Sequence, residues 1–167
     1  FCILNRINLK FSFKEHFYIA ILGISLFNIN YVFFYLSTQY LISGFVALCF
    51  SSILFMNVIN NIIFKQNYPK IMTLVGGLVG TLGLLFIFYD EITNFEFSKG
   101  TSYGIFIGVL ATYFASIGNL VSEYTSKIKM NVISVAGYGM LYGSITLLLY
   151  LLITGIDLNF DMSYRYI

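Results

Sequence analysis

The stretch YLISGFVALCFSSILFMNVINNIIF, residues 40–64, decides the fold. It contains no Asp, Glu, Lys, Arg or His. A helix of this length, at about 1.5 Å per residue, exceeds the roughly 30 Å hydrocarbon core of a bilayer. Small residues recur along one side, and amides gather near the end: Ser43, Gly44, Ala47, Ser51, Asn57, Asn60 and Asn61. Lipid offers amides no hydrogen-bond partner, so we expect them to bond other helices or to face a wet cavity, and both alternatives are open.

Composition places the whole chain in the membrane class. Its 167 residues are 59% hydrophobic and 10% charged, and the mean hydropathy is +0.86. Soluble domains carry about 25% charged residues, and a soluble domain of this size has too little interior to bury so much apolar surface. We therefore predict an all-α fold, a polytopic transmembrane helix bundle.

Several functional classes find no support in the residues. The net charge of +2 comes from short basic loops, so no nucleic-acid partner is expected. Cys2 and Cys49 lie in different segments and have no disulfide or metal-ligand spacing, and His16 is expected to be a lone loop histidine. The sequence shows no nucleophile–base pairing and no phosphate-binding loop, so it predicts neither an enzyme nor a cofactor.

Hydrophobic runs predict five spans in total. They cover about residues 17–36, 40–64, 71–89, 103–124 and 132–154. The uncharged turn Ser37-Thr38-Gln39 makes the first two spans an antiparallel hairpin, and residues 90–102 are expected to form a polar loop.

Small residues mark packing faces on the third and fourth spans. Gly76, Gly80 and Gly83 recur at helical spacing, which lets another backbone approach closely. A longer seam follows on the fourth span: Gly104, Gly108, Ala111, Ala115, Gly118 and Ser122. A polar stripe runs beside it: Thr112, Ser116, Asn119 and Glu123. We expect both glycine-rich faces to permit helix sliding.

Loop charges predict the topology. Basic residues fall before the first span and after the second and fourth: Arg6, Lys10, Lys14, Lys65, Lys70, Lys127 and Lys129. The intervening loop and the tail are mostly acidic. The positive-inside rule therefore places residues 1–16, 65–70 and 125–131 in the cytoplasm.

The order of these motifs resembles the EamA-type branch of the drug/metabolite transporter superfamily. The matching features are Asn30-Tyr31, then Ser43, Gly44 and Ala47, then Gly76 and Gly83, then Gly118-Asn119, Gly139-Met140 and Gly143. Many relatives carry a proline in the helix that corresponds to residues 40–64, where this chain has Ser51-Ser52. Many also carry Gly-Glu at its cytoplasmic end, where this chain has Phe64-Lys65-Gln66.

The resemblance implies a ten-helix fold of two inverted repeats, of which this chain is roughly helices three to seven. Residues 1–89 would be the C-terminal part of the first repeat, 90–102 the inter-repeat loop, and 103–167 the N-terminal part of the second. The implied partners are the remaining helices of the same protein, a small-molecule solute and the lipid bilayer, and a homo-oligomer stays open. We expect a multi-pass protein of the bacterial inner (cell) membrane.

Transporters of this kind bind solute near the midplane, between repeats. Polar groups well inside the spans are the candidate substrate-binding residues: Asn28, Tyr31, Tyr35, Asn57, Ser116, Asn119, Tyr138 and Tyr142. The first three share a helix face by spacing. Amides and phenols suit a neutral or zwitterionic solute, although tyrosines near span ends also mark the membrane interface. Glu123 comes closest to a buried charge, and we read it as a helix-end residue near Lys127.

These features favour a transporter of small metabolites or drugs that works by alternating access, as exporter or exchanger. The alternative is a truncated, non-transporting helix bundle or assembly partner. A membrane enzyme is a third and weaker alternative.

Overall fold

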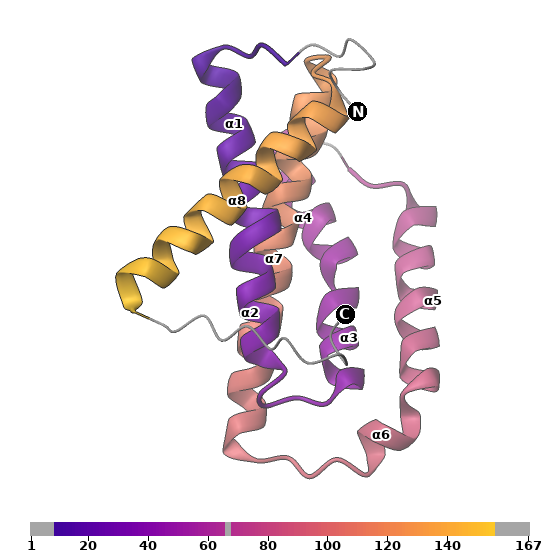
Figure 1. Ribbon diagram of the computed structural model, residues 1–167. Helices are drawn as coiled ribbons and strands as arrows, with labels where there is room; N and C mark the ends of the chain where they lie inside the picture. The colour runs from indigo at the N-terminus through magenta and orange to yellow at the C-terminus, as the bar shows by residue number, and fades with distance from the viewer. Residues whose placement is uncertain (1–8, 66–67, 156–167) are drawn as a thin grey trace, which may run out of the picture.

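The computed structural model describes residues 9–65 and 68–155, which form helices joined by short turns (Figure 1). The elements are α1 (Phe13–Ile24), η1 (Ser25–Ile29), α2 (Asn30–Ser37), α3 (Ser43–Ser51), α4 (Ile53–Lys65), α5 (Ile71–Ile87), α6 (Tyr89–Thr93), α7 (Lys99–Lys127) and α8 (Val132–Thr154). Within the described part, four segments are long and apolar enough to cross a membrane: Phe13–Ser37, Ser43–Phe64, Lys99–Lys127 and Val132–Thr154. The predicted all-α membrane bundle is thereby confirmed.

The third predicted span is shorter than the other four. Its helix, α5, has 17 residues, which corresponds to about 26 Å at about 1.5 Å per residue. The chain then turns at Phe88 into the short helix α6. The loop predicted over residues 90–102 is therefore wrong at both ends, because α6 occupies its start and α7 begins at Lys99.

Polar N-terminal caps explain why α1 and α7 begin before their apolar stretches. Ser98 and Thr101 form a capping box that starts α7 four residues before the predicted Tyr103. Ser12 and Glu15 do the same for α1, with Glu15 Oε2 accepting from the Ser12 N–H at 2.6 Å. His16 consequently lies in α1, and the prediction of a loop histidine is wrong.

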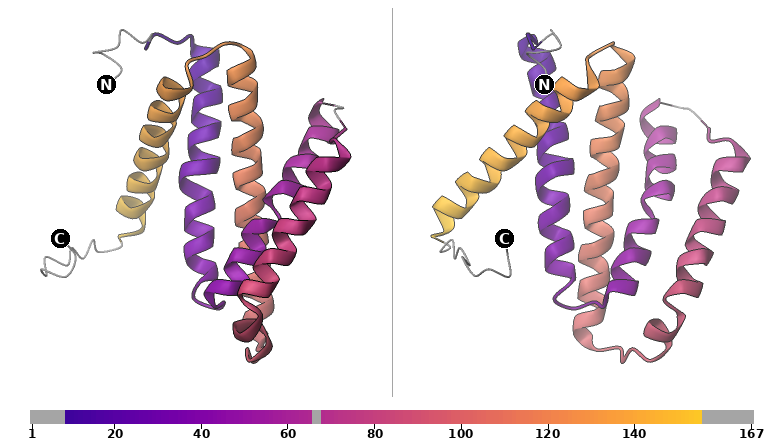
Figure 2. Two further views of the ribbon diagram at one scale, coloured as in Figure 1. Left: turned by 90° about the vertical axis from the view of Figure 1, so that its right-hand side faces the viewer. Right: turned by 45° about the vertical axis from the view of Figure 1, so that its right-hand side comes forward.

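The long helices stand side by side in a row, with α8 tilted across its neighbours (Figure 2). From one edge the order is α8, the α1–η1–α2 rod, α7, the α3–α4 pair and α5. In the described part of the chain, helix α7 packs against α1, α2, α3, α4 and α8, whereas the main contacts of α5 are with α3 and α4. The predicted hairpin of the first two spans is confirmed, since α2 and α3 run antiparallel (Figure 1).

The small-residue seam of α7 is packed as predicted. A Cβ built on Gly104 would lie 2.7 Å from Tyr40 Cβ, and one on Gly118 would lie 2.7 Å from Leu26 Cβ. Ala111 and Ala115 on the same seam are buried. The prediction of a close-packed face on the fourth span is confirmed.

The glycine stripe of α5 differs from the prediction. A Cβ built on Gly76, Gly80 or Gly83 would have no described neighbour within 4 Å. Helix α5 instead packs through Gly77, where a Cβ would meet Leu54 Cδ2 at 2.7 Å. The stripe faces away from α3 and α4, so the expected close approach to it is absent among residues 9–65 and 68–155.

The first span contains a π-helical turn, η1. The Asn30 N–H donates to the Ser25 carbonyl, five residues back, in place of the usual four. The Asn30 side chain then donates through Nδ2 to the Leu26 carbonyl at 3.3 Å. The middle of the first span thus contains an irregular turn and an amide side chain that bonds a carbonyl of that turn.

The second span is interrupted at Ser52, between α3 and α4. The Ser51 hydroxyl donates to the Leu48 carbonyl at 2.7 Å, and the Ser52 hydroxyl donates to the Cys49 carbonyl at 2.6 Å. Thr112 of α7 donates to the same Cys49 carbonyl at 3.0 Å. Serine hydroxyls that bond back to the preceding turn bend helices, so Ser51-Ser52 produces a break without proline.

Candidate functional site

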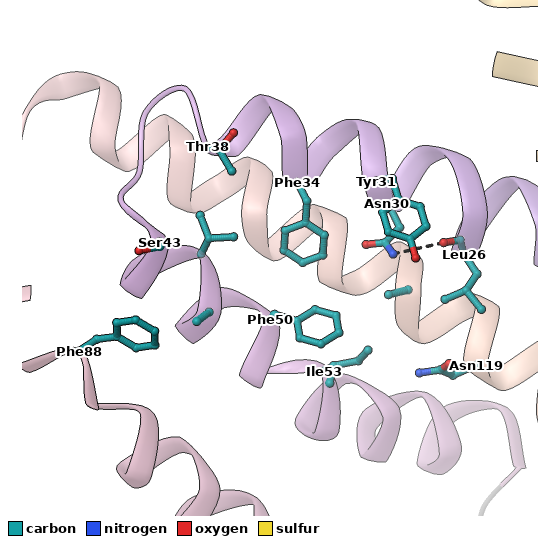
Figure 3. Close-up of a pocket in the computed structure, with 13 residues that line it drawn as sticks. Leu26, Asn30, Tyr31, Phe34, Thr38, Ser43, Phe50, Ile53, Phe88 and Asn119 are labelled. Carbon is teal, nitrogen blue, oxygen red and sulfur yellow. Dashed lines mark hydrogen bonds between the residues drawn. The ribbon is translucent and has the colours of Figure 1, made fainter. Parts of the chain in front are cut away.

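A cavity of about 780 Å³ lies between α2 and the α3–α4 pair, with α7 behind it (Figure 3). We call it the chamber. Its walls are mostly apolar, and Phe34 of α2 meets Phe50 of α3 inside it, edge to face, with ring centroids 5.4 Å apart. A volume in this range matches the cavities that hold small organic ligands.

Asn30 supplies a polar group to the chamber wall. Its side chain is 5% exposed, and its Nδ2 is engaged by the Leu26 carbonyl. Its Oδ1 is buried, and no group in the described part of the chain donates to it. Figure 3 shows the amide held against Leu26 by this bond, with the carbonyl oxygen on the other side. The Asn30 side chain thus contributes to the chamber wall, while its unpaired Oδ1 is buried away from the open space.

Two of the predicted site residues also line the chamber. Tyr31 stands beside Asn30 and is 61% exposed, and Asn119 reaches the same cavity from α7 (Figure 3). Thr38 and Ser43 add hydroxyls toward the turn between α2 and α3. The chamber thus pairs a broad apolar wall with amide and hydroxyl groups.

A second cavity, of about 90 Å³, lies between α4 and α7. We call it the small pocket. Asn57, Asn60, Asn61, Ser116, Asn119, Leu120 and Glu123 line it. Asn60 is 1% exposed and donates through Nδ2 to Ser116 Oγ at 2.8 Å. Asn119 lines both cavities, so the chamber and the small pocket adjoin there.

Asn57 resembles Asn30 in one respect. Its Oδ1 is buried, and no described residue donates a hydrogen bond to it. Both alternatives for the amides of the second span are therefore realised, because Asn60 bonds another helix while Asn57 and Asn61 face a cavity.

Glu123 closes the polar stripe of α7. Its Oε1 lies 3.0 Å from Lys127 Nζ, one turn on, and both side chains are substantially exposed. The predicted proximity of Glu123 to Lys127 at the helix end is confirmed. The same carboxylate borders the small pocket.

The remaining predicted site residues lie elsewhere. Asn28, in the π turn, donates through Nδ2 to Thr146 Oγ1 at 2.7 Å and to the Gly143 carbonyl, so it points at α8. Tyr35 is 70% exposed and is not part of the chamber wall. The prediction that Asn28, Tyr31 and Tyr35 share one face is wrong, because the π turn offsets Asn28 from the other two.

Tyr138 and Tyr142 belong to an aromatic cluster between α1 and α8. Tyr142 Oη lies 2.7 Å from His16 Nδ1, and Tyr138 donates to the Leu9 carbonyl at 3.3 Å. Phe11 and His16 pack edge-on against the Tyr138 ring. Both tyrosines are on α8, and neither lines the chamber.

Sequence reasoning missed Asn30 and Asn60 as site residues, although both stood in quoted motifs. Their signal was an uncharged amide inside an apolar run, shared with Asn57 and Asn28. Helical periodicity could not separate them, because the π turn shifts the phase around Asn28 and Asn30, and the spacing within α4 does not show which of its amides meets Ser116.

Comparison of the chain with family models, with curated proteins and with solved structures found no match. The case for a function therefore rests on the two cavities and their residues.

Proposed function

We propose that this chain is part of an EamA-type transporter, and that the chamber holds a small metabolite or drug in transit. The observation that carries the proposal is a large, mostly apolar cavity to whose wall Tyr31, Asn119 and Ser43 bring amide and hydroxyl groups. A solute with an N–H or O–H donor on an apolar body complements this wall.

The predicted residues take different roles in such a transporter. Tyr31 and Asn119 contact the solute, while Asn57 and Ser116 belong to the adjoining small pocket. Asn28, Tyr138 and Tyr142 hold α8 against the first span, where their hydrogen bonds lie. Tyr35, being exposed beside the chamber, meets either lipid or further helices of the proposed ten-helix protein.

Alternating access requires that helix groups move relative to each other around the site. The α1–α8 contact is one place where such groups would meet, and glycine backbones approach each other closely there. A Cβ on Gly143 would lie 2.9 Å from the Gly23 carbonyl oxygen. Motion at this contact would also have to break the hydrogen bonds of Asn28 with Thr146 and of Tyr142 with His16.

The proposed orientation keeps the connections that follow α4 and α7, with Lys70, Lys127 and Lys129, in the cytoplasm of a bacterial inner membrane. Cysteine replacement of Lys70 and Glu91, followed by labelling with an impermeant maleimide in intact cells, tests it. We expect label at position 91 only, and labelling at position 70 would reverse the topology.

Filling the chamber tests transport. Ala47 lines the chamber on α3, so Ala47→Trp should block uptake of any transported solute into vesicles while the protein still folds. The control is Leu148→Trp, an exposed position on α8, which should leave uptake unchanged. Uptake that survives Ala47→Trp at the wild-type rate would exclude the chamber as the route.

A non-transporting helix bundle that assembles with a partner is the second candidate. The uncovered glycine stripe of α5 and the exposed Tyr31 favour this second candidate, because a partner protein could pack on both. A screen of diverse solutes in vesicles separates the two, because an assembly partner would move none of them.

A further inference from the structure

We propose that the solute held in the chamber is uncharged and aromatic, with one hydrogen-bonding head group. This inference rests on the proposed function, because it names the class of solute for the same cavity. It begins from the distribution of polar and aromatic side chains along the chamber wall.

The chamber wall offers no partner for a charge. Among the described residues that form it, none is an Asp, Glu, Lys, Arg or His. Ser43, at one end of the wall, donates to Glu91 Oε2 at 3.2 Å, but Glu91 is exposed on α6 and is not part of the wall. An ammonium or carboxylate group inside the chamber would therefore lose its hydration without gaining an opposite charge.

Most polar groups on the wall already have partners within the protein. Thr38 donates its hydroxyl to a backbone carbonyl one turn back at 2.7 Å, and Asn30 donates an amide N–H to another at 3.3 Å. In contrast, neither Tyr31 nor Asn119 bonds another group within residues 9–65 and 68–155. These two side chains are therefore the ones with hydrogen-bonding capacity left for a solute.

Tyr31 and Asn119 lie at the same end of the chamber, one on α2 and the other on α7 (Figure 3). A phenol hydroxyl and a primary amide can each donate and accept a hydrogen bond. Together they suit one neutral head group, such as an alcohol, a phenol or an amide. The rest of the solute then meets apolar side chains.

Aromatic rings line the remainder of the chamber. Figure 3 shows Phe34 and Phe50 in the middle and Phe88 at the end opposite Asn119. Aromatic rings prefer offset or edge-to-face contacts with other rings, and an aromatic solute would extend the edge-to-face arrangement of Phe34 and Phe50. The volume of about 780 Å³ lies in the range that holds drug-sized molecules, so a bicyclic ring system fits.

A matched series of naphthalene compounds tests the charge of the solute by equilibrium dialysis at neutral pH. Naphthylmethanol is neutral, naphthylmethylamine is cationic, naphthoate is anionic and naphthylalanine is zwitterionic. The protein is held in lipid nanodiscs, and empty nanodiscs of the same lipid correct for partitioning into the bilayer. We expect saturable binding of the alcohol, and binding of the three charged compounds weaker by about tenfold or more.

Variants of the polar end locate the head group. Tyr31→Phe should weaken binding of naphthylmethanol by about fivefold and leave methylnaphthalene, which lacks the hydroxyl, unchanged. Asn119→Leu should give the same result, so either variant decides if the other fails to fold. Tyr35→Phe is the matched control, because Tyr35 is exposed on the same helix outside the wall, and it should leave both affinities unchanged.

The saturated analogue, decahydronaphthylmethanol, tests the aromatic body. It keeps the head group and the approximate size but loses the ring–ring contacts, so it should bind about threefold more weakly than naphthylmethanol. Equal affinities of the two alcohols would refute the aromatic class.

The remaining adverse results separate this inference from the transport proposal. A charged compound that binds as tightly as naphthylmethanol would refute the uncharged class and still leave the chamber as a solute site. Equal losses for naphthylmethanol and methylnaphthalene in both variants would refute the head-group contacts. Saturable binding of no compound would refute the aromatic class, whereas the transport proposal would fall only if uptake also survived Ala47→Trp.

Discussion

The third and fourth spans carry similar glycine patterns and use them in opposite ways. In α7, Gly104, Gly108 and Gly118 each lie within contact distance of another segment, and the helix is the centre of the bundle. In α5, Gly76, Gly80 and Gly83 meet nothing described. A small-residue stripe permits close approach, but the neighbouring helix and its side chains decide whether the approach occurs.

The largest effect should come from placing one bulky side chain on each stripe. Gly118→Leu would drive a side chain into Leu26, whose backbone nitrogen already lies 3.3 Å from a Cβ at this position. We expect it to lower the free energy of unfolding by about 3 kcal/mol. Gly80→Leu should be neutral or stabilise by up to about 1 kcal/mol, because it replaces glycine inside an open helix face. Unfolding in mixed micelles measures both, and equal losses would show that the α5 stripe is packed.

A smaller insertion probes the other glycine contact, between α1 and α8. A Cβ on Gly23 would overlap the Gly139 carbonyl oxygen, and backbone cannot step aside as a side chain can. Gly23→Ala should therefore cost about 2 kcal/mol in unfolding free energy. Gly137→Ala is its control, since nothing lies within 4 Å of a Cβ there. A Gly23→Ala protein as stable as the control would disprove this close contact.

The polar stripe of α7 can be tested in the same paired manner. Ser116→Ala leaves the buried Asn60 amide without its acceptor and should cost about 1 kcal/mol. Ser144→Ala removes a hydroxyl that bonds only its own helix, at Met140, on an exposed face, and should cost less than half as much. Thermal unfolding of the two variants side by side gives the comparison, and a smaller loss for Ser116→Ala would argue against the Asn60 bond.

The smallest effect belongs to the exposed end of α7. Lys127→Ala removes an ion pair between side chains that are 55% and 44% exposed, so we expect a loss of about 0.5 kcal/mol or less. A double-mutant cycle with Glu123→Gln at low and high salt measures it. The coupling should vanish at high salt, and a coupling that persists would mean that the pair is more shielded than its exposure suggests.

Hydropathy and periodicity predicted much of this fold, for identifiable reasons. Long apolar runs located the helices, and the i, i+4, i+7 pattern located the packed seam and the polar stripe of α7. The helix ends were misplaced because capping by Ser98 and Ser12 is a polar signal outside the apolar run. The packed face of α5 could not be predicted from its own sequence, because it is the contact with Leu54 of α4 that places Gly77 at the interface.

The candidate site was predictable in part. Ser116 and Asn119 follow regular spacing on an unbroken helix, and they do lie together at the small pocket. Asn28 lies inside the π turn and points at α8, whereas Tyr31 lines the chamber, and no composition in a single sequence reveals such a turn. His16 was missed for a different reason, since its partner Tyr142 is 126 residues away along the chain.

The π turn at Ser25–Ile29 has a consequence for how the first span tolerates change. The π turn holds one more residue than a regular helical turn, which rotates the following residues by about 100° about the helix axis. As a result, Ile19 and Leu22 before the turn pack toward α8, while Asn30 and Phe34 after it line the chamber. Deleting any single residue of this turn would restore a regular helix. The residues before and after the turn would then no longer face α8 and the chamber at the same time. Substitutions within this turn should therefore destabilise the fold much less than the insertion or deletion of one residue.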